Sequence, residues 1–200
     1  MRRIVLAAVL AAPFLASAAN LVANGSFEDT VQGNGTWHIY SNLPGWTGGS
    51  AGIELRHAVA GNAYDGVNFV ELDTTQNSLM FQNIATNLGQ GYELSFAFSP
   101  RTGVGSASNG IEVFWNGATQ GVFTGNGSGS GNVWSIKTVS VTGAALSSKL
   151  EFRAVGTSDS YGGSLDAVTL TSAVPEPGTY ALMLGGLGAL VFVARRRREF

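Results

Sequence analysis

The central part of this 200-residue chain alternates apolar and polar residues, a pattern with a period of two. No segment between Asn20 and Thr171 sustains the 3.6-residue apolar period of an amphipathic helix. Pairs such as Asn116-Gly117, which are typical of tight turns, separate the alternating segments. Strands are expected at residues 37–40, 53–58, 68–73, 79–84, 92–99, 111–115, 122–124, 133–141, 150–155 and 165–170. Roughly ten short strands joined by turns predict an all-β fold, an antiparallel β-sandwich or jelly roll, over residues 20–172.

Cysteine is absent from the sequence, so a disulfide framework, a thiolate metal site and a cysteine nucleophile are all excluded. The charge is unevenly distributed, because six of the eleven basic residues lie at the two ends of the chain. The span from 20 to 174 has five basic and eleven acidic residues, and therefore a net charge of −6. This balance argues against nucleic-acid binding, which needs a basic surface, and suits divalent cations and neutral ligands better.

The first residues have the three parts of a secretory signal peptide. Two arginines follow Met1, residues 4–15 form an apolar region interrupted only by Pro13, and Ala16-Ser17-Ala18 supplies the small residues of a cleavage site. The apolar region is too short to favour a first transmembrane helix. We therefore expect residues 1–19 to be a signal peptide that directs export by the Sec pathway.

The last residues combine a proline-rich spacer, an apolar segment and a basic tail. The spacer covers residues 173–179, the apolar segment 180–194 and the tail 195–200. The apolar segment would form a helix of about 22 Å, against a hydrocarbon core of about 30 Å, so it predicts a single short transmembrane helix. Arginines remain on the cytoplasmic side, which places the rest of the chain outside. The residues that define this pattern are Pro175, Glu176, Pro177, Arg195, Arg196, Arg197 and Arg198.

This tripartite tail resembles the PEP-CTERM sorting signal of Gram-negative bacteria. The resemblance implies that an exosortase-type processing protease recognises the tail while the protein is transiently anchored in the inner membrane. It also implies removal of the helix and delivery to the cell surface or the extracellular matrix.

Three short segments frame the central domain: residues 20–28, Leu43-Pro-Gly-Trp46 and residues 161–170. They resemble the framing segments of galactose-binding-like jelly rolls, which occur in bacterial carbohydrate-binding modules and in a plant cell-wall family. The resemblance implies a jelly-roll fold and the binding of sugars.

In many modules of this kind a structural calcium ion joins the first strand region to the last strand. Carried over to this sequence, the carboxylate ligands would be Glu28 and Asp166, with backbone carbonyls near Asn24 and Ser26 as further ligands. Calcium prefers six to eight hard oxygen ligands, and such an ion would fasten the two ends of a domain without cysteine. The alternative is that both acids only cap turns or face solvent.

Aromatic residues are the candidates for stacking on sugar rings, because a flat apolar ring covers the C–H face of a pyranose. We predict Trp37, Tyr40 and Trp46 as the carbohydrate-binding residues. Trp37 lies in a segment rich in glycine and asparagine, which favours exposure. Trp46 follows Pro44-Gly45 and has burial in the core as its alternative interpretation.

Catalytic patterns are weak, and no catalytic residue is predicted. Residues 48–52 fit Gly-x-Ser-x-Gly, but a nucleophile elbow requires a helix afterwards, and a strand is expected here. Glu71 and Asp73 lie two apart on an expected strand, about 7 Å from each other on one side, a separation found between glycosidase carboxylates. The solvated face of a sandwich strand explains the same alternation.

The sequence as a whole predicts an exported cell-surface or matrix protein that binds extracellular polysaccharide without catalysis. One alternative is a structural matrix protein that associates with itself. Another is a weak carbohydrate-active hydrolase or lyase that uses the Glu71–Asp73 pair.

Overall fold

The computed structural model describes residues 19–173 and residue 186 of the chain. The predicted signal peptide, spacer, transmembrane helix and basic tail lie outside these residues, except for Ala19, Ala173 and Gly186. Within the described part of the chain, no helix has the length and apolar character needed to cross a membrane. Residues Ala19–Ala173 form one compact unit.

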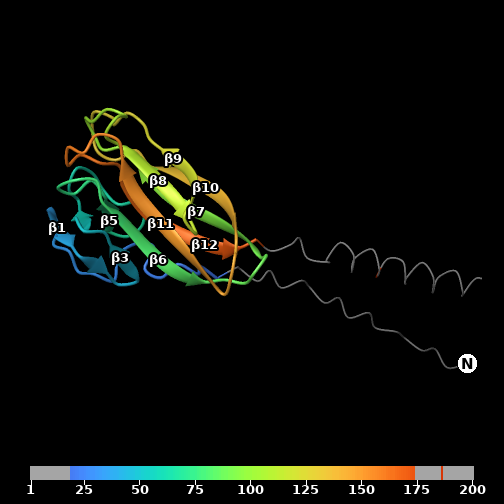
Figure 1. Ribbon diagram of the computed structural model, residues 1–200. Coiled ribbons are helices and arrows are strands. Elements are labelled where there is room, and N and C mark those ends of the chain that lie inside the picture. The colour runs from blue at the N-terminus through green and yellow to red at the C-terminus, as the bar shows by residue number, and fades with distance from the viewer. Residues whose placement is uncertain (1–18, 174–185, 187–200) are drawn as a thin grey trace, which may run out of the picture. The chain divides into compact units, whose positions relative to one another are not determined.

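Two antiparallel sheets of six strands each make up this unit (Figure 1). The first sheet contains, in spatial order, β1 (Thr36–Tyr40), β4 (Ile53–His57), β5 (Asn68–Glu71), β12 (Ser164–Ser172), β7 (Gly91–Ser99) and β10 (Ser135–Thr142). The second contains β2 (Asn42–Leu43), β3 (Trp46–Gly48), β6 (Leu79–Ala85), β11 (Ser147–Val155), β8 (Gly110–Trp115) and β9 (Ala118–Phe123). The predicted all-β antiparallel sandwich is confirmed.

The pairing of the last eight strands identifies the jelly roll. Strand β5 pairs with β12, β6 with β11, β7 with β10 and β8 with β9, so the first strand of the eight meets the last and the pairing closes inward. This is the arrangement of a four-pair antiparallel ribbon rolled into two sheets. Strands β1 and β4 extend one sheet, and β2 and β3 extend the other.

The period-two pattern predicted nearly all of these strands, but it missed β2 and β3. Each has only two or three residues, too few to show an alternation. Residues 49–52 connect β3 to β4, so a strand and not a helix follows the Gly-x-Ser-x-Gly pattern. That pattern is therefore no nucleophile elbow.

The core lies between the two sheets and consists of the inward side chains of both. On β7, Leu94, Phe96 and Phe98 are buried at alternate positions, as predicted. The Trp46 ring lies 5.9 Å from that of Phe27 and 6.1 Å from that of Phe152. Each buried side chain of this size contributes about 1.5–3 kcal/mol to folding.

Loops cover part of the outer face of the first sheet, on the side opposite the core. Trp134, just before β10, packs edge-on against Phe69 of β5 with ring centroids 5.8 Å apart, and its indole N–H donates to the Asn62 carbonyl at 2.9 Å. The loop between β4 and β5 is thereby fixed over the sheet. This cover explains how charged residues on an outer sheet face become buried.

Candidate functional site

Five residues on β1, β4 and β5 form the outer face of the first sheet near its β1 edge. Trp37 of β1 is directly opposite Arg56 of β4, and Ile39 is opposite Glu54. Glu54 is in turn opposite Glu71 of β5. Because directly opposed residues in an antiparallel pair point to the same side, these five side chains form one continuous surface.

Charged groups at the base of this surface form a buried network. The Arg56 guanidinium contacts the Glu54 carboxylate at 2.6 Å and the Glu71 carboxylate at 2.5 Å. Arg101, which follows β7, reaches the same Glu71 carboxylate at 3.1 Å. Glu71 is completely buried, and Arg56 and Glu54 are only 2% and 4% exposed. Burial raises the pKa of Glu71 to about 7, although the two arginines and the Gly162 N–H favour its ionised form.

Asp73 fixes the loop between β11 and β12 above this network. One of its carboxylate oxygens accepts the backbone N–H groups of Asp159, Ser160 and Tyr161 at 2.9, 2.9 and 3.3 Å. Gly162 then passes so close that a Cβ atom there would lie 2.9 Å from the Asp73 Cβ. Only glycine allows this approach.

Glu71 and Asp73 both accept backbone N–H groups of this loop, and both are fully buried. The interpretation that they line a solvated face is therefore wrong, because the loop between β11 and β12 covers them.

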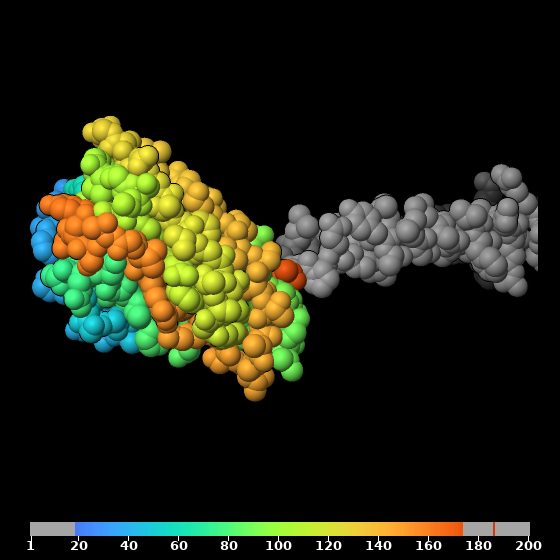
Figure 2. All heavy atoms as spheres, turned by 45° about the horizontal axis from the view of Figure 1, so that its top comes forward, coloured from blue at the N-terminus to red at the C-terminus, as the bar shows by residue number. Residues whose placement is uncertain are grey.

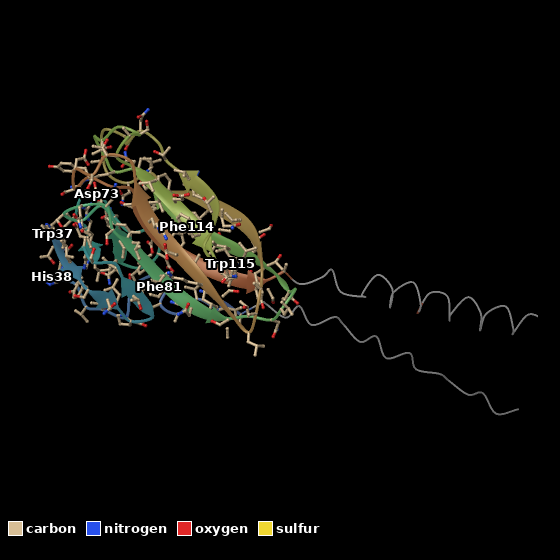
Figure 3. All side chains as sticks on the ribbon, in the orientation of Figure 1. Trp37, His38, Asp73, Phe81, Phe114 and Trp115 are labelled. Carbon is tan, nitrogen blue, oxygen red and sulfur yellow. The ribbon has the colours of Figure 1, made fainter. Side chains whose placement is uncertain are left out.

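A pocket of about 260 Å³ opens above the charged network. Its lining includes Trp37, Arg56, Thr75, Arg101 and Ser160. Trp37 is 54% exposed and presents the indole ring at the rim. In Figure 3, Trp37 and Asp73 lie at the same end of the sandwich. The pocket thus combines an exposed aromatic ring with polar groups held in fixed positions.

A second, larger pocket of about 540 Å³ adjoins the first through Arg101. Ser108, Asp159 and Tyr161 are among the residues that line it. The Arg101 guanidinium lies over the Tyr161 ring, 4.6 Å from its centroid, so one side chain separates the two pockets and contributes to both.

The three predicted carbohydrate-binding residues do not lie together. Trp37 lines the 260 Å³ pocket. Tyr40 lies three positions further along β1, hence on the opposite side of the strand, where it packs against the core and donates its hydroxyl to Gln32 at 3.0 Å.

Trp46 is 2% exposed, and its indole N–H donates to the Asn24 carbonyl at 3.1 Å. Its prediction as a sugar-stacking residue is wrong, because the sandwich encloses it between the sheets.

Sequence reasoning missed Arg56 and Arg101 as members of the site. The small number of basic residues could have indicated them, because the span from 20 to 174 has only five. In an acidic domain an arginine on an expected strand has acidic partners nearby. What brings Arg101 to Glu71, thirty positions away, is the pairing of distant strands.

The two carboxylates predicted to bind calcium both hold the same loop. One Glu28 oxygen accepts the N–H groups of Val67 and Asn68 at 2.8 and 2.7 Å. One Asp166 oxygen accepts those of Tyr64 and Asp65 at 2.7 and 3.0 Å. Residues 64–68, which we call the clasped loop, are therefore fixed from the first and the last segments of the domain.

Asn24 and Ser26 lie in the turn before Glu28. The Asn24 side-chain oxygen accepts the Asp29 N–H at 3.1 Å, and Ser26 is half-buried. Within residues 19–173, no three His, Asp or Glu side chains form a group that could hold a metal ion. Calcium binding, which also invokes backbone oxygens, stays a prediction.

The chain matches the model of the PEP-CTERM protein-sorting motif over residues 173–198. Two curated relatives are both described as multifunctional-autoprocessing repeats-in-toxin. The protein of Vibrio cholerae serotype O1 is 36% identical over 157 residues, and that of Vibrio vulnificus is 35% identical over 163 residues. Each alignment covers 78% of this chain but only 3% of the relative's length.

Among solved structures, a cyclase from Fischerella sp. TAU, in complex with 4-(1H-indol-3-yl)butan-2-one, superposes with a TM-score of 0.57 at 13% identity. The superposition covers 78% of this chain and 98% of that one. A family 35 carbohydrate-binding module from an environmental isolate gives a TM-score of 0.49 at 16% identity, covering 69% and 93%. At these identities the cyclase shows a shared fold alone. The chain is thus a protein with a PEP-CTERM sorting motif whose described domain is a jelly-roll β-sandwich.

Proposed function

We propose that this protein is exported and binds extracellular polysaccharide through the pocket beside Trp37. The observation that supports this most is the exposed Trp37 ring at the rim of a pocket with fixed polar groups. A sugar ring would stack on the indole, while Arg101, Thr75 and Ser160 would bind its hydroxyl groups. An aromatic platform with a few placed polar groups is the usual composition of a small-molecule site.

The charged network makes the pocket rigid before a ligand arrives. Arg56 and Glu71 are held by each other and by Glu54 and Arg101, and Asp73 holds the loop that carries Ser160. A ligand then loses less free energy to the ordering of side chains. The net charge of −6 between residues 20 and 174 favours a neutral polysaccharide over a strongly anionic one.

We propose binding without catalysis, because the only close carboxylate pair predicted from the sequence is unavailable to a substrate. Glu71 is enclosed by two arginines and the Gly162 N–H, and Asp73 by three N–H groups of the loop above it. A general acid or base must reach the reacting atoms within hydrogen-bond distance. Glu71→Gln and Asp73→Asn would abolish any turnover by this pair, so polysaccharide cleavage that survives both changes excludes it.

A glycan array with the full chain tests the binding function. The Trp37→Ala variant should bind about ten-fold or more weakly, a loss of about 1.4 kcal/mol or more. Tyr64→Ala is the matched control, because Tyr64 is similarly exposed at 51% and does not line this pocket. Equal affinity of the Trp37→Ala and native proteins would place the site elsewhere.

Absence of binding to all bacterial and plant polysaccharides would contradict glycan recognition altogether. Concentration-dependent oligomers in sedimentation without a glycan would then support the self-associating matrix protein.

For the tail we propose recognition by an exosortase-type protease after transient anchoring in the inner membrane, followed by delivery to the cell surface or matrix. The sorting motif at residues 173–198 supports this. Intact-mass measurement of the protein from the surface fraction tests it: loss of the segment after the Pro175-Glu-Pro177 spacer is expected. A full-length C-terminus on the surface protein would contradict processing.

A further inference from the structure

The end of the sandwich opposite the Trp37 pocket exposes two leucines on adjacent turns. Leu88, between β6 and β7, is 77% exposed, and Leu146, between β10 and β11, is 82% exposed. Leu21, near the start of the domain, is 39% exposed and lines the same hollow of about 560 Å³ as Leu146. We call these three leucines and the turns that carry them the leucine end.

Hydrogen bonds join the two turns into one unit. The Thr86 N–H donates to the Leu146 carbonyl at 3.0 Å, and the Gly89 N–H donates to the Gly143 carbonyl at 2.8 Å. The Gly143 N–H donates in return to the Gln90 carbonyl at 2.9 Å. Single exposed leucines are common on protein surfaces, but here two are held together on a rigid support.

The leucine end carries no charge. Segments 19–24, 85–92, 116–120, 142–148 and 170–173 contain no acidic or basic residue. The domain nevertheless has a net charge of −6, so its charges lie along its sides and at the opposite end. An acidic domain is repelled least by an anionic membrane when its uncharged end faces the membrane.

The chain leaves the domain at this end. The Ala173 N–H donates to the Gly91 carbonyl at 2.9 Å, and the Gln90 side chain donates to the Ala173 carbonyl at 3.2 Å. Figure 2 shows the green β6–β7 turn and the orange β10–β11 turn beside each other at the end where the orange-red last strand finishes. The sorting motif starts at residue 173, and its apolar segment begins at Tyr180. If that segment is anchored in the inner membrane, as proposed above, the seven residues before it span at most about 25 Å and keep this end close to the bilayer.

We propose that the leucine end docks on the lipid surface while the sorting motif tethers the domain. Leu88 and Leu146 enter the interfacial layer, and the uncharged turns contact the headgroups. The Trp37 pocket, at the other end of β7 and β12, then faces away from the membrane. Docking rests on the proposed membrane anchoring of the tail but not on the proposed glycan binding, because no residue is shared between the two surfaces.

Single cysteines can test this in the full chain, since the sequence has none. An environment-sensitive fluorophore is attached at Leu88→Cys, Leu146→Cys or Ser106→Cys in protein reconstituted into vesicles of phosphatidylethanolamine and phosphatidylglycerol. Ser106 is exposed on the loop between β7 and β8, at the opposite end. The labels at 88 and 146 should shift to shorter wavelength and be quenched several-fold by brominated lipids, and the label at 106 should not.

Equal, weak quenching at all three positions would overturn the proposal. A wavelength shift at 88 and 146 without lipid quenching would also overturn it, because a protein contact would then cover the leucines. A second measurement is the fluorescence anisotropy of the label at 106, which should fall when Leu88→Ser and Leu146→Ser release the domain from the surface. Val133→Ser, an exposed apolar position away from the leucine end, should leave the anisotropy unchanged.

Discussion

At the scale of single residues, burial decides the ionisation of two carboxyl groups. It raises the pKa of Glu71 from 4.5 to about 7, against the opposing effect of two arginines. It raises the pKa of Asp166 from 3.8 to about 7, and the negative charge of Asp65 adds to this effect. A raised pKa means that the native state binds a proton which the unfolded chain has already released. The stability that these groups contribute is present below about pH 4 and is lost as the pH rises to above 7.

The free energy of unfolding should therefore fall between pH 5 and pH 7, with a slope that approaches about 1.4 kcal/mol per pH unit for each group. Urea unfolding at several pH values measures the slope, which Asp166→Asn should reduce by one group's share. Glu151→Gln is the control, because interactions with Lys149 and Arg153 lower the pKa of Glu151 and place its titration below this range. A native slope of zero would contradict both raised values.

The two tryptophans that the sequence predicts for sugar binding should respond differently to truncation. Trp46→Ala should cost about 3–5 kcal/mol in the free energy of unfolding, because it opens a cavity between the sheets. Trp37→Ala should change that free energy by about 0.5 kcal/mol or less, because the ring is half exposed. Urea unfolding of the two variants checks this, and similar losses would mean that Trp37 is a core residue.

At the scale of elements, carboxylate acceptors shape the loops that surround the sheet. The clasped loop is held by Glu28 and Asp166, and the loop between β11 and β12 is held by Asp73 and Glu71. Short loops held by carboxylates stay ordered without a disulfide. This order gives the pocket beside Trp37 its fixed lining.

Gly66 is the most sensitive position of the clasped loop. It has a φ of +70°, and a Cβ atom there would lie 2.5 Å from a Glu28 carboxylate oxygen. Gly66→Ala should therefore cost more stability than Gly89→Ala, which has a φ of +76° but an open surrounding. Both glycines have a positive φ, so the difference between the two variants' free energies of unfolding measures only the cost of the clash with Glu28. We expect this difference to be about 1–3 kcal/mol. Equal losses would mean that Glu28 does not hold this loop.

At the scale of the whole molecule, the jelly roll brings the first and last segments of the domain together and separates the two ends for which we propose functions. The Asn20 side chain bonds to β12, and the Leu21 N–H donates to the Leu170 carbonyl at 2.9 Å. Both ends of the domain therefore lie at the leucine end, away from the Trp37 pocket (Figure 1).

We propose that a structural calcium ion reinforces this closure, as the resemblance to carbohydrate-binding modules implies. The residues fit such an ion to the extent that Glu28 and Asp166 are hard-oxygen ligands that reach the same clasped loop. Calcium should raise the melting temperature, EDTA should reverse the gain, and Asp166→Ala should abolish the response. Glu93→Ala, which removes an exposed carboxylate of β7, is the control. If neither calcium nor EDTA changes the melting temperature of the native protein, calcium binding is contradicted.

The sequence alone determined most of the strands and the sorting motif, because both depend on local patterns. Alternation over residues 92–99 reports the burial of one face of β7, and the tail is read from consecutive residues. The expected strand at residues 68–73 is shorter in the structure, because β5 ends at Glu71 and Asp73 lies beyond it.

Only the tertiary structure decided which of these residues can meet a ligand. Whether a residue is buried depends on which other parts of the chain lie over it. The two sheets enclose Trp46, and a loop some ninety positions away covers Glu71. Trp37 stays exposed because β1 is an edge strand, and Arg101 joins the site only because β7 and β12 are neighbours. Such contacts depend on the pairing of distant strands, which no local pattern encodes.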